Sequence, residues 1–238
     1  MTHRRLALLA TLVLSAATPG WAAPAPLIPL ARPDGQNRLW QSRERADYGP
    51  LAQEFLTQAN LAYCGVASSV MVLNSLDIPA PAAAGYGAYR FWTQENFFDD
   101  PATRAVLPPE TVARQGMTLD QLSALLASHG LEVERTYAAD LSLEQFRQVV
   151  RRNLAQGGDR LLVNYYRPLV GQEGGGHISP LAAYNAEGDR ILLLDVARYR
   201  YPSVWIRTED LWQAARAVDS SSGRSRGLVS IRSRRPAP

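Results

Sequence analysis

Apolar residues recur at helical spacing within residues 61–76. Val66, Val70 and Leu73 lie three or four positions apart, and small or apolar residues occupy the positions between them. Such a segment has apolar side chains on most of its sides, which predicts a helix buried in the core. Cys64 lies at the start of this predicted helix.

Two later segments begin with the capping-box pattern, in which a Ser or Thr is followed three residues later by Gln. The two pairs are Thr118 with Gln121 and Ser142 with Gln145. Gly130 and Gly157 end the apolar-periodic runs that follow, as is typical of helix C-termini. A shorter helix is expected with Thr208 as its N-cap, because Glu209 and Asp210 come next and acidic side chains favour the first turn.

From about Arg160 the pattern changes to short runs that are typical of β-strands. The four predicted strands are Leu161 to Tyr166, His177 to Tyr184, Ile191 to Val196 and Leu228 to Ile231. A turn at residues 185–189 joins the middle two as a hairpin. Helices therefore precede an antiparallel sheet. This order predicts an α+β fold, one domain with a helical N-terminal half, a sheet in the C-terminal half and a cleft between them.

Composition excludes several classes of mechanism and partner. The chain is 46% hydrophobic and 20% charged, which is ordinary for a globular protein. All 25 residues counted as Lys or Arg are Arg, so a Schiff-base lysine, a P-loop lysine and a Ser-Lys pair are excluded. The formal net charge of +3 comes from scattered arginines rather than from a dense basic block, so no nucleic-acid partner is expected.

The first 22 residues have the pattern of a secretory signal peptide. Arg4 and Arg5 precede an apolar run from Leu6 to Ala17, and Gly20 and Ala22 form a small-residue pair before a cleavage site predicted after Ala22. The run is short for a membrane span, which needs about 20 residues, and an uncleaved anchor is the alternative. The folded part is therefore expected to be periplasmic or secreted, with no stable membrane association after cleavage.

The remaining chain divides into three predicted parts. Residues 23–50 are rich in Pro and Ala toward their start and are expected to form an extended lead-in. Residues 51–232 are expected to form the folded domain, and residues 233–238 a short tail.

Cys64 is the single cysteine of the chain, so it cannot close an internal disulfide. At a helix N-terminus, unpaired backbone N–H groups and the helix dipole favour the thiolate, which would make Cys64 a nucleophile. The alternative is a small buried apolar residue, the usual environment of a free cysteine. No metal site is expected, because one cysteine and one suitable histidine are too few ligands.

His177 is the best candidate for a base that serves this thiol. His3 falls in the predicted signal peptide, and His129 has the place of an ordinary residue at a helix C-terminus. His177 follows three glycines, the last of which is Gly176. Because glycines have no side chain, a substrate can approach the backbone closely there. Asp195 lies in the next predicted strand and would orient the imidazole if the hairpin pairs residues whose numbers sum to about 372 or 374. A slip of one residue would place the two side chains on opposite faces, and a strand-end carboxylate bonded to backbone is the alternative for Asp195.

Gln58 lies six positions before Cys64. Its side-chain amide, together with the backbone N–H of Cys64, is a candidate oxyanion hole. By itself a Gln in a polar turn carries no such meaning. The order Gln, Cys, His, Asp along the chain raises this hypothesis above the alternative.

Three local strings carry a resemblance to a known family. They are QANLAYCG at 58–65, GGHISPLAAYN at 175–185 and DVARYRYP at 195–202. In this order they resemble the phytochelatin synthase family, a branch of the papain-like cysteine-peptidase fold, and in particular its short bacterial, single-domain members. The resemblance extends over roughly residues 51–231.

The resemblance implies a papain-like enzyme acting on glutathione. Cys64 would attack the Cys-Gly bond, release glycine and form a γ-glutamylcysteinyl-enzyme. This intermediate would pass mainly to water, with transfer to a second glutathione as the route to phytochelatins. His177 would be the general base and acid, Asp195 its orienting carboxylate and Gln58 the oxyanion donor.

A further segment, residues 217–228, resembles the part of the family that holds the γ-glutamyl end of the substrate. Asp219 suits the α-amino group of a γ-linked glutamate, and Arg226 suits its α-carboxylate. Asn164 and Gly176 are added as candidate substrate-binding residues. A solvated salt bridge in a Ser/Gly loop is the alternative for Asp219 and Arg226.

No metal or organic cofactor is expected for this chemistry, and metal ions would enter only as thiolate complexes of the substrate. Two other functions stay open: an exported cysteine peptidase that cuts ordinary peptides, and a non-catalytic module that binds thiol peptides or metal thiolates. A homodimer also stays open. Roles in metal tolerance and in general thiol turnover both fit the chemistry.

Overall fold

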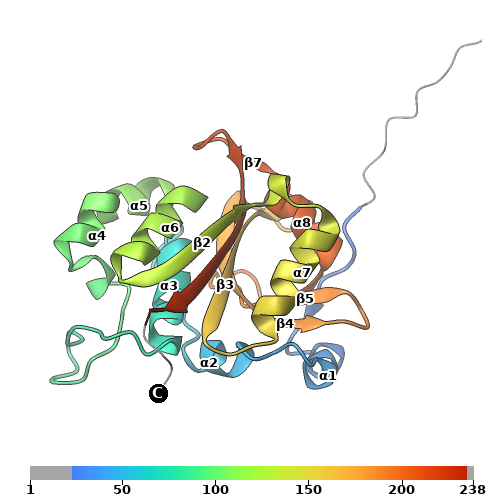
Figure 1. Cartoon of the computed structure of the whole chain (residues 1–238), viewed down its shortest axis with the longest axis horizontal. Helices are drawn as coiled ribbons and strands as arrows, with labels where there is room; N and C mark the ends of the chain where they lie inside the picture. The colour runs from blue at the N-terminus through green and yellow to red at the C-terminus, as the bar shows by residue number, and fades with distance from the viewer. Residues whose placement is uncertain (1–22, 235–238) are drawn as a thin grey trace, which may run out of the picture.

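A seven-stranded sheet forms the centre of the protein in the computed structural model, which describes residues 23–234 (Figure 1). Its strand order is β1-β6-β5-β4-β3-β9-β2, and every neighbouring pair is antiparallel. The strands are β1 (Ile28–Pro29), β2 (Leu131–Tyr137), β3 (Asp159–Tyr166), β4 (Gly176–Asn185), β5 (Arg190–Leu193), β6 (Val204–Arg207) and β9 (Gly227–Ser233). A separate ribbon pairs β7 (Val218–Asp219) with β8 (Arg224–Ser225). The α+β class is confirmed, and β3, β4, β5 and β9 correspond to the four predicted strands, although β5 ends at Leu193 and so stops short of Asp195. The other strands were not predicted from the sequence.

Helices cover both faces of the sheet. They are α1 (Pro33–Gln41), α2 (Tyr48–Gln53), α3 (Cys64–Ser75), α4 (Pro101–Val106), α5 (Pro109–Gln115), α6 (Leu119–Ser128), α7 (Leu143–Leu154) and α8 (Thr208–Arg216). In Figure 1, α3 and the helices α4 to α6 lie on the left of the sheet, and α7 and α8 lie on the right. The expected division into a helical half and a sheet half is therefore incomplete: β2 joins the sheet from the N-terminal half, and α7 and α8 cover its second face.

Side chains of β3 alternate between the two cores. Leu161, Val163 and Tyr165 pack in the core under α7 and α8, whereas Leu162 belongs to the core around α3. This is the period-two alternation of a strand that is buried on both faces. It places Asn164, two residues after Leu162, on the α3 side of the sheet.

Capping residues explain where several helices begin. Both predicted capping boxes are present, with Thr118 and Ser142 as the N-caps of α6 and α7. The N-cap prediction for Thr208 is wrong: Thr208 is the first residue of α8, and Arg207 precedes it without a side-chain cap. The Thr208 hydroxyl instead donates to the carbonyl of Asp189 at 2.9 Å, so it joins α8 to the β4–β5 turn.

The segment 23–50 is not an extended lead-in, because it contains α1 and the start of α2. Pro33 stands at the start of α1, where its missing N–H removes no helical hydrogen bond. Trp205 of β6 donates its indole N–H to the carbonyl of Gly35 at 2.9 Å, which ties α1 to the sheet. The Pro-rich composition of this segment therefore led to a wrong prediction, because α1 belongs to the folded domain. The predicted signal peptide lies outside the described residues.

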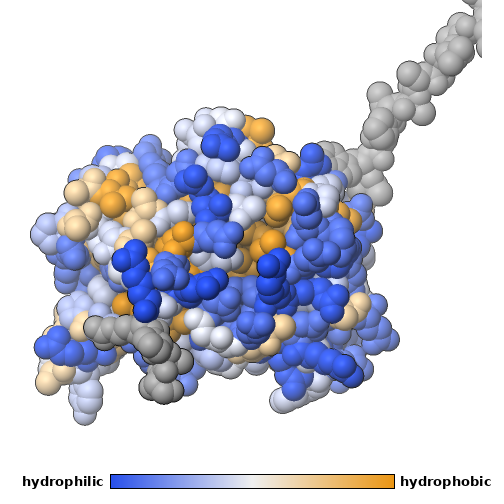
Figure 2. Space-filling model, viewed as in Figure 1, coloured by the Kyte–Doolittle hydropathy of each residue, from blue (hydrophilic) through white to orange (hydrophobic). Residues whose placement is uncertain are grey.

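Hydrophilic residues cover most of the face shown in Figure 2, with hydrophobic residues between them in limited patches. Within residues 23–234, no helix combines the length and the apolar character needed to cross a membrane.

Candidate functional site

Cys64 is the first residue of α3, as the sequence predicted, and its side chain is buried at 9% exposure. Burial by itself raises the pKa of the thiol, but the charge and hydrogen bond of His177 and backbone hydrogen bonds from Ile178 and Gly65 outweigh it. The net result is a lowered pKa of Cys64. The thiolate is therefore favoured at the start of the helix.

His177, the second residue of β4, lies between Cys64 and Asp195. Its Nε2 is 2.9 Å from Oδ1 of Asp195 and 3.0 Å from Oγ of Ser179, so Nδ1 is the ring nitrogen left for the thiol. Burial lowers the pKa of His177, but the neighbouring Cys64 thiolate and the hydrogen bond to Asp195 raise it overall. Opposite shifts in the pKa values of Cys64 and His177 favour a thiolate–imidazolium pair.

A β-bulge decides that His177 and Asp195 share a face. Next to the turn, Asn185 pairs with Arg190, a register that would point His177 and Asp195 to opposite faces. The bulge between Leu181 and Ala183 absorbs one residue, and Leu181 then pairs with Leu193. The shifted register is one of the two that the sequence hypothesis required.

Arg167 holds the carboxylate of Asp195 from the other side, and the sequence reasoning missed it. Its Nη1 donates to Oδ2 of Asp195 at 2.8 Å and its Nη2 donates to Oδ1 at 2.9 Å. Burial of Asp195 raises the pKa of its carboxyl, but His177 and Arg167 lower it to about 2. Both Arg167 and Asp195 are buried, so the carboxylate is fixed in one orientation. Nothing in the sequence distinguishes Arg167 from the other arginines of the chain.

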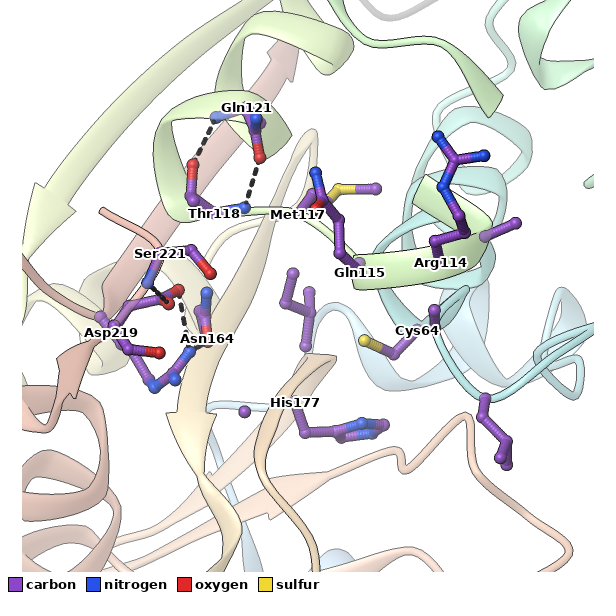
Figure 3. Close-up of a pocket in the computed structure, with 18 residues that line it drawn as sticks. Cys64, Arg114, Gln115, Met117, Thr118, Gln121, Asn164, His177, Asp219 and Ser221 are labelled. Atoms are coloured by element: carbon purple, nitrogen blue, oxygen red, sulfur yellow. Dashed lines mark hydrogen bonds and ion pairs between the residues drawn. The ribbon is translucent and has the colours of Figure 1, made fainter. Parts of the chain in front are cut away.

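A cavity of about 910 Å³ opens beside Cys64 and His177 (Figure 3). Four other residues singled out from the sequence also line it: Asn164, Gly176, Asp219 and Arg226. In Figure 3, Asp219 and Asn164 lie on one side of the cavity, and Cys64 and His177 lie across from them. Segments far apart in the chain thus contribute to one pocket, as the sequence hypothesis required.

Arg226 is the centre of the polar group at this end of the cavity. Its Nη1 donates to Oδ1 of Asn164 at 3.0 Å and to Oδ2 of Asp219 at 3.1 Å, while the backbone N–H of Ser221 donates to the other oxygen of Asp219 at 3.0 Å. Nε of Arg226 is buried without a hydrogen-bond partner. The group therefore holds a carboxylate and a guanidinium side by side and retains hydrogen-bonding capacity.

Gly176 leaves the space that the side chain of Arg226 occupies, a role that the sequence did not indicate. A Cβ at this position would lie 2.4 Å from Nη1 and 2.7 Å from Cζ of Arg226. The glycine therefore makes room for the guanidinium, in addition to lining the cavity.

Gln58 is buried next to the catalytic candidates but is not among the residues that line the cavity. Its backbone N–H donates to the carbonyl of Val196 at 3.0 Å, which fixes it beside the residue that follows Asp195. Its Nε2 donates to the carbonyl of Asn60 at 2.7 Å, and its Oε1 is buried without a partner. Its role as an oxyanion donor stays a prediction.

The opposite wall of the cavity comes from the end of α5 and the start of α6, which the sequence reasoning did not connect with the site. Its polar residues are Arg114, Gln115, Thr118 and Gln121. Met117 of the same wall packs against the start of α3, where a Cβ on Gly65 would lie 2.6 Å from its sulfur. Only the packing of α5 and α6 beside α3 could reveal this wall.

Outside the Cys64 site, the described residues include one further histidine, His129, and no cluster of metal ligands. His129 is the C-cap of α6 and packs against the rings of Trp92 and Phe97. Burial lowers the pKa of His129 to about 4. Among residues 23–234, no three His, Cys, Asp or Glu side chains are grouped where they could share a metal ion.

Comparison with known proteins identifies the family. Residues 20–228 match the family model described as phytochelatin synthase. Glutathione gamma-glutamylcysteinyltransferase 2 of Arabidopsis thaliana is 34% identical over 82% of this chain and 42% of its own length. Glutathione gamma-glutamylcysteinyltransferase 3 of Lotus japonicus is 32% identical over 90% of this chain and 44% of its own. The Schizosaccharomyces pombe glutathione gamma-glutamylcysteinyltransferase is 30% identical over 81% and 45%.

The chain spans less than half the length of these relatives. The matched part nevertheless includes every residue of the candidate site, from Gln58 to Arg226. Because the family model matches most of the length of this chain, the chain belongs to the phytochelatin synthase family.

Proposed function

We propose that this protein cleaves the Cys-Gly peptide bond of glutathione through a γ-glutamylcysteinyl-enzyme on Cys64, within a papain-like fold. The observation that carries the proposal is the shared cavity. A Cys64–His177 pair with mutually favourable pKa shifts opens into the same space as the Asp219–Arg226 pair. Nucleophile and substrate-recognition groups are thus available to one small ligand.

The first half of the reaction forms the acyl-enzyme. The Cys64 thiolate attacks the carbonyl carbon of the Cys-Gly bond and forms a C–S bond. The imidazolium of His177 gives its proton to the peptide nitrogen as the C–N bond breaks, and glycine leaves with a neutral amine. Asp195, held by Arg167, keeps the imidazole oriented and stabilises its charged form.

The second half releases the acyl group. Neutral His177 takes a proton from water as the water oxygen attacks the thioester carbon. The C–S bond then breaks, which restores the thiolate and the imidazolium and yields γ-glutamylcysteine. Transfer to the amine of a second glutathione follows the same steps and lengthens the peptide. We propose hydrolysis as the main outcome.

Gln58 and the backbone N–H of Cys64 would stabilise the oxyanion that forms in both halves. One N–H of the Gln58 amide already donates to Asn60, which leaves the other for this purpose.

The polar end of the cavity suits a γ-linked glutamate. Such a group exposes an α-amine and an α-carboxylate on the same carbon, and Asp219 and Arg226 offer the opposite charges side by side. An ordinary peptide lacks this pair of free groups. We therefore expect selectivity for γ-glutamyl substrates. The proposed chemistry needs no cofactor, and metal ions would enter only as thiolate complexes of the substrate. The predicted signal peptide places the proposed site of action outside the cytoplasm.

The test is intact-mass analysis of the purified, reduced protein mixed with glutathione. We expect a γ-glutamylcysteinyl adduct on Cys64, stoichiometric release of glycine, and accumulation of γ-glutamylcysteine. An ordinary α-linked tripeptide of Glu, Cys and Gly is the control substrate. If the α-linked peptide is cleaved equally well, the peptidase function replaces this proposal. If neither substrate forms an adduct, a binding function replaces it.

A second prediction concerns Gly176. Gly176→Ala places a Cβ against the guanidinium of Arg226 and forces that side chain away from Asn164 and Asp219. Because small displacements of positioning groups are costly, kcat/KM for glutathione should fall by about tenfold or more. The assay measures initial rates of glycine release.

Gly175→Ala is the matched control, because nothing lies within 4 Å of a Cβ at that position. It should behave like the wild type. Equal rates for Gly176→Ala and the wild type would show that the position of Arg226 does not matter for substrate binding.

A further inference from the structure

The residues that line the cavity beside Cys64 form two groups. One end is the Asn164, Asp219 and Arg226 group, and the other end is the wall formed by α5 and the following loop. In Figure 3, Arg114 lies on the Cys64 side of the cavity, away from Asp219 and Asn164. If the γ-glutamyl group occupies the Asp219 end, the group that leaves or attacks the acyl carbon must occupy the Arg114 end.

Two polar side chains on this second wall are uncommitted. In the capping box, the side-chain oxygens of Thr118 and Gln121 accept hydrogen bonds from one another's backbone N–H groups, which holds both side chains against the start of α6. Arg114 and Gln115 are exposed, and no hydrogen bond or ion pair joins either side chain to another residue within 23–234. Nothing fixes the Arg114 guanidinium, so it is free to turn toward a ligand at Cys64.

The chemistry of the reaction places a carboxylate at this end twice. The leaving glycine carries its carboxylate on the carbon next to the departing nitrogen. The α-amine of a second γ-glutamyl peptide, which attacks the same acyl carbon from the vacated position, also carries a free carboxylate on the adjacent carbon. The two groups present the same arrangement of nitrogen, carbon and carboxylate to this wall.

On the basis of the proposed function, we propose that Arg114 binds this α-carboxylate. It would bind first the carboxylate of the leaving glycine and then the carboxylate of the amine that takes its place. A guanidinium offers two parallel N–H donors to a carboxylate. In the transfer step, the acceptor nitrogen forms a bond to the acyl carbon, its proton passes to His177, and the C–S bond breaks. The acceptor is therefore an α-amino acid or a γ-glutamyl peptide, rather than an ordinary peptide whose first carboxyl group is an amide.

The experiment compares substrates that differ only in this carboxylate. Cleavage of glutathione is measured beside cleavage of its C-terminal glycinamide, and exchange of isotope-labelled glycine into glutathione is measured beside exchange of glycinamide. The wild type should favour the carboxylate form in both assays by about fivefold, since an exposed arginine gains from one charged pair. Arg114→Gln should lose this preference in cleavage and in exchange alike.

Arg152→Gln is the matched control, because Arg152 is an exposed arginine in the last turn of another helix, α7, and does not line the cavity. It removes the same charge and should retain the wild-type preference. Equal preference in Arg114→Gln and the wild type, or an equal loss of rate on both forms of the substrate, would overturn the inference. Adduct formation on Cys64 by the wild type, with glutathione preferred over the α-linked tripeptide, separates these outcomes from failure of the proposed function, which would show no adduct or no such preference.

Discussion

Replacing Cys64 by Ser should reduce glutathione cleavage by at least about a thousandfold and abolish the covalent adduct. A serine hydroxyl stays protonated near neutral pH, so the ion pair with His177 is lost along with the nucleophile. The substitution retains nearly the same volume at a buried helix start, so the fold should persist. Glycine release and intact mass measure the effect, and circular dichroism with thermal unfolding verifies the fold.

The companion variant is His177→Ala. Because thiol and imidazole act as a unit, His177→Ala should be almost as inactive as Cys64→Ser, and the double variant should be no worse than either. Alkylation by iodoacetamide gives an independent readout. Cys64 should react rapidly near neutral pH in the wild type, and more slowly in His177→Ala, because His177 is the main group that lowers the pKa of the thiol. A slow reaction in the wild type, together with no cleavage of glutathione by the wild type, would favour the non-catalytic binding module, whereas unchanged turnover in Cys64→Ser would exclude Cys64 as the nucleophile.

Replacing Arg167 by Met should have the largest effect on stability. Arg167 and Asp195 form a buried, two-bond ion pair, and removing Arg167 leaves the buried carboxylate with His177 as its remaining counter-charge. Breaking such a pair costs about 3–5 kcal/mol of unfolding free energy. Turnover should fall as well, because Asp195 is then free to rotate away from His177. Urea unfolding and kcat measure the two effects.

Arg200→Met is the matched control, since Arg200 forms an exposed ion pair with Glu173. Its unfolding free energy should change by no more than about 1 kcal/mol. Equal stability of Arg167→Met and Arg200→Met would contradict a structural role for the buried pair.

The pH dependence of unfolding gives a second test of the same pair. The folded-state pKa of Asp195 is about 2, below its ordinary value near 3.9, so the pair's contribution is fully present above about pH 5 and is lost as the pH falls toward 2. In Arg167→Met, burial raises the pKa of Asp195 without the opposing arginine, so acid unfolding should begin at a higher pH. Denaturant titrations between about pH 2 and pH 7 measure the shift.

Local signals in the sequence determined much of the secondary structure. The capping boxes at Thr118 and Ser142 and the apolar spacing of residues 61–76 mark three helices, because a cap or a buried face depends on residues only three or four positions apart. Errors arose where composition is ambiguous, as in the Pro-rich segment that contains α1. Strands β1 and β6 were missed because they are short, and β2 was missed because charged, exposed residues alternate with or interrupt its apolar positions.

Residue chemistry also determined the candidates of the site. A single cysteine at a helix start, a histidine after a glycine run and a carboxylate in an apolar run were all identified by residue type and neighbours. The bulge at residues 181–183 lay beyond this reasoning, because the register of a hairpin depends on the pairing of whole strands rather than on either strand alone. Without that bulge, Asp195 would face away from His177.

Only the tertiary structure decided which other groups complete the site. Arg167 is one arginine among many until folding buries it against Asp195. The α5–α6 wall, with Arg114, is distant in sequence from both Cys64 and His177 and joins them only because α5 and α6 lie beside α3. Sequence fixes which groups a chain has available and which local elements carry them. The packing of those elements decides which groups meet, because contacts between distant segments follow from burial of the whole core.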